Sequence, residues 1–231
     1  MDLFRISIFG FRIYHTPNVH NINSYRVESV PGHLDSGIYV FSAALLALQG
    51  LLQQPSDHAS PSRRPLRHLE ARNMIKIIGI DPGLSATGIG VVTGKGLLVH
   101  AYSYGTIHTS KDITLPHRLD KIYSKLTEIL QKEHPDHMVV EDVFSLNNYP
   151  KSGILLGKVT GVLLLAGFKA GVSVSEVAVR EAKKVLTGNG RATKQQLEKA
   201  VRKKLNLIDP IKPYHASDAL GLALIGLYRY G

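Results

Sequence analysis

Met74-Ile75-Lys76-Ile77-Ile78-Gly79-Ile80-Asp81-Pro82-Gly83 is an almost continuous apolar run that ends on a carboxylate and a Pro-Gly turn. A β-branched run of this kind is typical of a central strand that is buried on both faces of a sheet. An aspartate at the end of such a strand is costly to ionise unless a cation or a hydrogen-bond donor meets it. Asp81 is therefore a candidate metal ligand. The alternative, a residue that merely opens the turn, is equally open at this point.

The charge of the chain favours a polyanionic partner. Its 231 residues carry 28 Lys and Arg against 18 Asp and Glu, a net charge of +10. Residues 74–231 hold +8 of this charge and residues 1–73 hold +2. A strongly basic domain is typical of nucleic-acid binding, although basic surfaces also serve solubility. The chain has no cysteine, which excludes disulfides, thiolate metal sites and cysteine nucleophiles and fits a reducing, cytoplasmic interior.

Residues 1–73 show no pattern that specifies a fold. Residues 53–73 are rich in Pro, Ser, Arg and His, which is typical of a linker or of disorder. We expect residues 74–231 to form one domain, and residues 1–73 to be an extension that is either disordered or an upstream start artefact. A genuine accessory or targeting segment is the alternative. The apolar run over 41–52 is far too short to span a membrane, and no signal peptide is expected.

The remaining residues predict an α/β fold. Apolar runs predict strands over 74–81, 87–93, 96–107, 138–141 and 172–176, and helical periodicity predicts helices over 115–133, 151–170, 179–186, 193–205 and 215–228. This order indicates a mixed sheet flanked by helices. Gly88 and Gly90 in the second strand are expected to let another backbone approach closely. The glycines at 153, 157, 161 and 167 favour close packing of the second helix.

Two of the predicted strands end on carboxylates, Asp81 and Glu141. If these strands lie side by side, both acids meet at one edge of the sheet. His215 and Asp218 are three residues apart near the start of the last helix and so share a helical face. Three carboxylates and an imidazole suit Mg²⁺ or Mn²⁺ better than zinc. Two such ions, about 3.5–4 Å apart, can clamp the attacking and leaving oxygens of a phosphodiester.

Each of these residues also has a structural explanation. Asp81 can cap a turn, Glu141 can pair with a lysine, Asp218 can cap the last helix, and a lone histidine near a helix start is more often structural. All of these explanations together require three acids to lie at element ends by coincidence. Asp142, next to Glu141, is expected to point to the opposite face of its strand, where it is solvated or paired.

Four motifs occur in order: Ile78-Gly-Ile-Asp-Pro-Gly-Leu-Ser-Ala-Thr-Gly-Ile-Gly, Val140-Glu-Asp-Val-Phe, Gly188-Asn-Gly-Arg-Ala-Thr-Lys and Ala216-Ser-Asp-Ala-Leu. Together they resemble the RuvC family of bacterial crossover junction endodeoxyribonucleases, over essentially all of residues 74–231. The resemblance implies an RNase H-like fold, a homodimer and resolution of Holliday junctions by paired symmetric nicks. It also implies Mg²⁺ or Mn²⁺ dependence with two ions per subunit, a cytoplasmic location without a membrane, and a branch-migration complex as a partner.

The resemblance assigns Asp81, Glu141, His215 and Asp218 to the metal-binding catalytic positions. Many members of the family have aspartate at the position of His215, and some have histidine. His215 is therefore either a metal ligand or a proton shuttle, or both.

The resemblance also implies DNA-binding roles. Phe144 matches an aromatic residue near the junction point, where it would stack on a base, and its alternative role is core packing. Lys183 and Lys194 match lysines near the DNA, and Arg191 is a further candidate contact to phosphate. Each of these basic residues can instead be part of a solvated helix face.

Other functional classes fit less well. Actin-like ATPases and sugar kinases share the Ile-Asp-x-Gly pattern but need a second phosphate loop, and the sequence has no second strand that ends in Asp-x-Gly. A YqgF-like nuclease that acts on RNA is a second alternative, and the region around Phe144 and the segment from Lys183 to Lys194 argue against it. A junction-binding protein that does not cleave is the third, and it conflicts with the complete set of acids.

Overall fold

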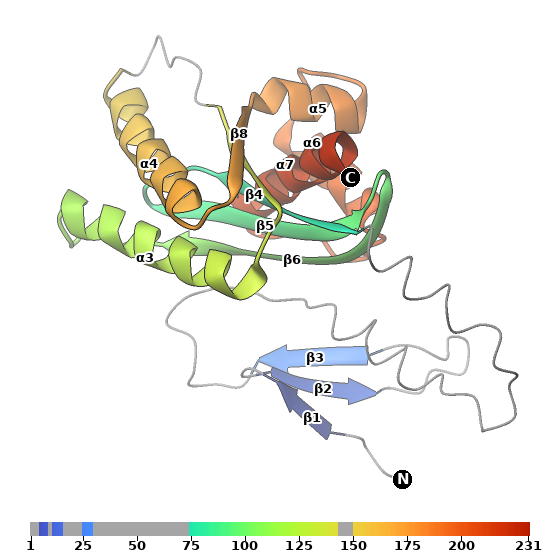
Figure 1. The fold of residues 1–231 in the computed structure, drawn as a ribbon. Helices are drawn as coiled ribbons and strands as arrows, with labels where there is room; N and C mark the ends of the chain where they lie inside the picture. Colours follow the sequence, from blue (N-terminus) through green and yellow to red (C-terminus); the bar gives the residue numbers. More distant parts are fainter. Residues whose placement is uncertain (1–4, 9–10, 16–24, 30–73, 143–149) are drawn as a thin grey trace, which may run out of the picture. The chain divides into compact units, whose positions relative to one another are not determined.

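The structure, a computed structural model, describes residues 5–8, 11–15, 25–29, 74–142 and 150–231. The chain divides into two compact units, residues 1–36 and 37–231. In the first unit, β1 (Arg5–Ile8), β2 (Phe11–His15) and β3 (Tyr25–Ser29) form an antiparallel sheet in that order (Figure 1). The sequence pattern predicts no strands there, so this sheet is an addition to the expected fold. The domain boundary at Met74 stays a prediction.

The second unit is built on a five-stranded mixed sheet. Its strands lie in the order β6-β5-β4-β7-β8. They are β4 (Ile75–Asp81), β5 (Ala86–Lys95), β6 (Leu98–His108), β7 (His137–Glu141) and β8 (Ser173–Val177). β4 lies at the centre, antiparallel to β5 and parallel to β7. Ile80 lies opposite Val140, so the next residues, Asp81 and Glu141, reach the same edge of the sheet, as the sequence predicts.

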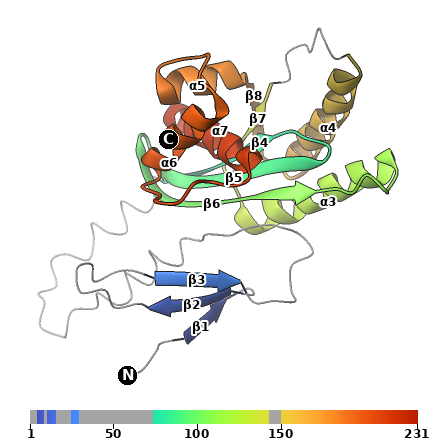
Figure 2. The same cartoon turned by 180° about the vertical axis from the view of Figure 1, so that it is seen from behind.

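Five helices of this unit cover the two faces of the sheet (Figures 1 and 2). One face carries α3 (Leu115–Glu133) and α4 (Pro150–Lys169). The other carries α5 (Val179–Thr187), α6 (Lys194–Lys204) and α7 (Tyr214–Tyr230). Every predicted helix and strand of residues 74–231 is present, with ends that differ by two residues at most. Phe144 lies outside the described residues.

Among the described residues, α4 is the one helix long and apolar enough to cross a membrane, by length and composition only. Its residues Val159, Leu163 and Ala166 are buried in the core on the α3 side of the sheet. Gly167 packs tightly as well, because a Cβ there would lie 2.5 Å from the Met138 methyl group. α4 is therefore packed as a helix of the folded domain.

The alternation of side chains along β4 determines where Asp81 points. Ile78 and Ile80 belong to the core beneath α3 and α4, whereas Ile77 belongs to the core around α7. Successive side chains of a strand point to opposite faces, so Gly79 and Asp81 lie on the same face as Ile77. The chain therefore delivers the carboxylate of Asp81 to the α7 face.

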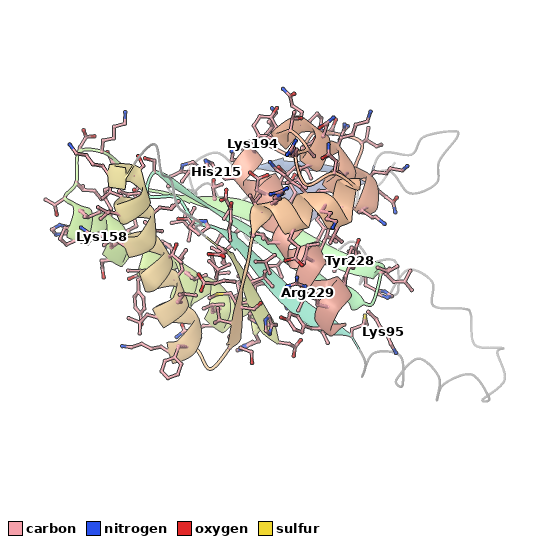
Figure 3. All side chains as sticks on the ribbon, turned by 90° about the horizontal axis from the view of Figure 1, so that it is seen from above. Lys95, Lys158, Lys194, His215, Tyr228 and Arg229 are labelled. Carbon is pink, nitrogen blue, oxygen red and sulfur yellow. The ribbon has the colours of Figure 1, made fainter. Side chains whose placement is uncertain are left out.

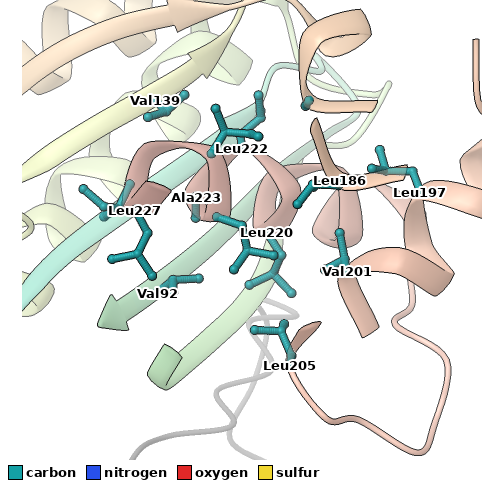
Figure 4. Packing of buried hydrophobic residues seen from close by; sticks show 14 of the residues in the cluster. Val92, Val139, Leu186, Leu197, Val201, Leu205, Leu220, Leu222, Ala223 and Leu227 are labelled. Carbon is teal, nitrogen blue, oxygen red and sulfur yellow. The ribbon is translucent and has the colours of Figure 1, made fainter. Parts of the chain in front are cut away.

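α7 lies directly on the sheet because three strand glycines leave room for its backbone. All residues from Ala216 to Leu227 are buried, and their side chains pack against β4, β5 and β7 and against α5 and α6 (Figure 4). A Cβ at Gly79 would lie 2.1 Å from the Ala219 carbonyl oxygen. One at Gly88 would lie 2.0 Å from that of His215. One at Gly90 would lie 2.6 Å from the backbone nitrogen of Leu220, so the expected close approach at Gly88 and Gly90 is confirmed.

Candidate active site

One cavity of about 430 Å³ brings the four predicted site residues together. It lies where β4 and β7 end and is lined by Asp81, Glu141, His215 and Asp218. Lys194, which also lines it, lies at the same end of the domain as His215 (Figure 3). Residues from two strands and one helix, far apart in the sequence, thus share one concave surface.

Asp81 is the centre of this group. Its side chain is buried, and its Oδ2 lies 2.6 Å from Nδ1 of His215, within a hydrogen bond. Glu141 hydrogen-bonds to the same carboxylate. Burial, the hydrogen bond to Asp81 and the negative charges of Asp81 and Asp218 together raise the pKa of Glu141 to about 9, against the opposing charge of Lys194. Glu141 therefore holds a proton at neutral pH when no cation is bound.

The pKa of Asp218 is raised for similar reasons. Burial and the charge of Asp81 raise its pKa to about 6, against the opposing charges of Lys194, His215 and Lys183. Nζ of Lys194 lies 3.7 Å from Oδ2 of Asp218. The other oxygen, Oδ1, is buried and finds no hydrogen-bond donor among the described residues. An uncompensated buried carboxylate oxygen is costly and is well suited to a cation.

His215 is held through one ring nitrogen. The hydrogen bond to Asp81 raises the pKa of the imidazole, while burial opposes this rise. Because Nδ1 faces Asp81, Nε2 is the nitrogen left to bind a metal or to exchange a proton.

This set of residues fits a divalent cation. Three carboxyl groups meet in one cavity, where two of their pKa values are raised, and a cation would relieve that conflict. Within the described part of the chain, no three His, Asp or Glu side chains already form a metal cage. Asp81 instead bonds to His215 and Glu141. Metal binding therefore requires Glu141 to release its proton.

Two of the predicted DNA-binding residues lie beside the acids. Lys183 on α5 and Lys194 at the start of α6 line the cavity. Thr193 fixes that helix start, because its hydroxyl accepts from the backbone N–H of Gln196 and the Gln196 side chain accepts in return. Arg191 is exposed in the turn between α5 and α6, outside the cavity lining that the described residues form.

Two further cavity residues were missed by sequence reasoning. Asp142 lines the same cavity as Glu141, and the expectation that its side chain points to the opposite face of the strand stays a prediction. β7 ends at Glu141, and the backbone N–H of Asp142 donates to the carbonyl oxygen of Val177 at the end of β8. Arg180, near the start of α5, also lines the cavity. A Cβ at Gly190 would lie 3.1 Å from Cγ of Arg180, so the turn after α5 packs on the aliphatic stem of this side chain. Gly190, in the motif Gly188-Asn-Gly, is the sequence signal for this contact with Arg180.

The geometry agrees with comparisons to known proteins. A family model described as crossover junction endodeoxyribonuclease RuvC matches residues 77–226. The chain belongs to the RuvC family. The crossover junction endodeoxyribonuclease RuvC of Rhodopirellula baltica is 40% identical over 152 residues, which cover 66% of this chain and 85% of that protein. The RuvC of Geotalea uraniireducens is 39% identical over 150 residues, covering 65% of this chain and 86% of that protein.

Solved structures of RuvC share the fold. The RuvC structure of Thermus thermophilus is 31% identical, with a TM-score of 0.60, and the match covers 67% of this chain and 95% of that one. A structure of T. thermophilus RuvC in complex with a Holliday junction substrate has a TM-score of 0.62, the same identity, and coverage of 67% and 94%. The RNase H-like fold that the sequence implies is therefore confirmed, and Holliday junction resolution is the activity of this family.

Proposed function

We propose that this protein resolves Holliday junctions by metal-dependent hydrolysis of DNA phosphodiesters, with Asp81, Glu141, His215 and Asp218 as the site. One observation carries the proposal: the three predicted carboxyl groups and the imidazole line a single cavity of a RuvC-family fold. Lys183 and Lys194 line the same cavity. A cytoplasmic location, and a branch-migration complex as a partner, follow from family membership as further expectations.

The acids and the lysines of the site have different roles, metal binding and phosphate binding. Asp81, Glu141 and Asp218 would hold two Mg²⁺ ions, with Mn²⁺ as an alternative, through oxygen ligands. When bound, such ions supply a water nucleophile of lowered pKa and neutralise charge on the phosphate. Lys183 and Lys194 bind phosphates beside the scissile bond through their ammonium groups.

His215 has two possible roles at this site, ligand and proton shuttle. A His215→Asp variant distinguishes them, because it keeps an oxygen ligand but cannot shuttle protons near neutral pH. Full cleavage activity with an unchanged pH profile would favour the ligand role. A change in the pH profile would favour proton transfer.

Asp81→Asn tests the proposal directly. The substitution removes a metal ligand without removing a basic contact, so cleavage of a synthetic four-way junction should be lost while junction binding stays intact or tightens. Asp120→Asn, at an exposed carboxylate on α3, is the matched control and should cleave normally. Loss of binding together with cleavage would indicate a structural role for Asp81. Cleavage of RNA in preference to the junction would favour the YqgF-like alternative, and Mg²⁺-independent binding without nicks would favour the non-cleaving one.

Paired nicks require two sites, and α4 offers a surface for a second copy. Ile154, Leu165 and Phe168 are 62%, 47% and 79% exposed and lie on one side of this helix, spaced by eleven and three residues. Gly157 and Gly161 face open space within this chain, so another backbone can approach there. An apolar stripe of this kind is typical of an interface.

Sedimentation equilibrium tests this interface. Leu165→Glu should convert a dimer to monomers, because it buries a charge at the contact. Leu97→Glu, at a residue that is 69% exposed in the β5–β6 hairpin, is the control and should stay dimeric. A monomeric parent protein would refute the homodimer.

A further inference from the structure

The loop of residues 82–85 links Asp81 to β5, and we call it the Asp81 loop. Thr109, the first residue after β6, binds this loop twice. Its hydroxyl donates to the Leu84 carbonyl oxygen at 2.5 Å, and its backbone N–H donates to the Ser85 carbonyl oxygen at 3.2 Å. Asp81 is the last residue of its strand to pair with β5, so the loop is what fixes the backbone beyond it.

Arg118, near the start of α3, holds this arrangement from a third element. Its Nε donates to the Thr109 hydroxyl at 2.8 Å, and its Nη2 donates to the Ser85 hydroxyl at 3.1 Å. The Thr109 hydroxyl has a single proton, which it donates to Leu84, so it must accept from Arg118. Thr109 is 8% exposed, so the two bonds of its hydroxyl are partly buried, whereas the bond between Arg118 and Ser85 is exposed. The guanidinium, with its rigid fork of donors, fixes both partners at once.

Arg118 does not act on the acids through its charge. The charges that shift the pKa values of Glu141, His215 and Asp218 come from Asp81, Asp218 and His215 and from the two cavity lysines. Arg118 does not line the cavity that the described residues form. Its connection to the site runs through the Asp81 loop, on the α3 side, while His215 contacts the carboxylate from α7.

We infer that Arg118 and Thr109 form a clamp on the Asp81 loop, and that Arg118 is a positioning residue for cleavage because the clamp fixes the carboxylate of Asp81. The effect on cleavage rests on the proposed function, whereas the clamp itself does not. A displacement of about 1 Å in a reacting group can cost up to about 100-fold in rate, so a loosened loop has a measurable effect on cleavage.

Single-turnover cleavage at saturating enzyme, measured beside junction affinity, tests the clamp. Arg118→Ala and Thr109→Val should each slow cleavage by about 10-fold, with the junction Kd unchanged within about twofold. Thr109→Ser keeps the hydroxyl and should cleave normally. The double variant should be slowed by less than the product of the two single effects, because both substitutions remove the bond between Arg118 and Thr109. Lys125→Ala is the charge-matched control on α3, and it removes only an ion pair with Glu128.

Amide hydrogen exchange in residues 83–87 provides a readout that needs no activity. Exchange there should quicken in Arg118→Ala and Thr109→Val but not in Lys125→Ala. Normal cleavage by both clamp variants would overturn the inference. A raised Kd with a lower salt slope in Arg118→Ala alone would also overturn it, because Arg118 would then be a phosphate contact. If the unaltered protein cuts no junction, the proposed function fails, and the exchange rates still decide whether the clamp exists.

Discussion

Gly88→Ala is the substitution most directly connected to the geometry of the site. Gly88 lies in β5, under the start of α7, and its neighbour across the strand pair is Asp81. An added Cβ would lie 2.0 Å from the His215 carbonyl oxygen and 3.2 Å from Cβ of Asp81. Both contacts involve residues of the site, and the closer one is to backbone, which cannot rotate away.

The size of the effect follows from these distances. Cβ atoms essentially never lie closer than 3.0 Å to another heavy atom, so the contact at 2.0 Å must open by at least 1.0 Å. If α7 moves by that amount, His215 and Asp218 move away from Asp81. We expect cleavage to fall by about 100-fold, as for a misplacement of about 1 Å. The strain should also reduce the free energy of unfolding by about 1–3 kcal/mol, typical of overpacking.

Gly221→Ala is the matched control. It adds the same methyl group within α7, but at 3.4 Å or more from the side chains of Leu186, Val201 and Leu197, which is ordinary contact. Because alanine is favoured over glycine in a helix, this variant should fold and cleave normally. Single-turnover cleavage of a four-way junction, junction binding and urea unfolding measure the comparison. Normal cleavage and stability in Gly88→Ala would refute the argument that backbone contact sets the site.

Three further predictions follow from the described side chains. In metal-free protein the free energy of unfolding should fall as the pH rises from about 4.5 to about 9, because the raised pKa values of Glu141 and Asp218 mean that the folded state binds more protons than the unfolded state. Urea unfolding across this range measures the fall, and an equal slope in Glu141→Gln contradicts it. Lys183→Ala combined with Lys194→Ala should weaken junction binding and reduce its salt slope by about 2, and an unchanged slope would contradict the phosphate contacts. Thr193→Ala should reduce the free energy of unfolding by about 1 kcal/mol through loss of the α6 cap, and a loss of equal size in Thr193→Ser would show that the cap is not the cause.

Local sequence patterns are sufficient to predict the elements that build the site. The apolar run before Asp81 and the shorter run before Glu141 specify strands that end on carboxylates, and the structure places them side by side as expected. The spacing of His215 and Asp218 specifies a shared helical face. These predictions succeed because each depends on residues close together in the sequence.

Contacts between elements that are far apart in the sequence cannot be predicted from local sequence patterns. Arg118 reads as an ordinary polar residue of an amphipathic helix, and nothing nearby in the sequence indicates its bonds to Thr109 and Ser85. Arg180 and Asp142 line the cavity because α5 and the end of β7 come together there. Tertiary packing decides all three, and a single sequence does not show it.

The position of α7 has a consequence for the order of synthesis. The ribosome completes Asp81 and Glu141, with all five strands of the sheet, before it adds His215 and Asp218. A nascent chain that ends before α7 therefore carries only half of the proposed catalytic group, and it lacks the helix that lies directly on one face of the sheet. The proposed catalytic site is therefore completed only when α7 has been synthesised and has packed on the sheet. An unfinished chain has no complete site with which to damage DNA.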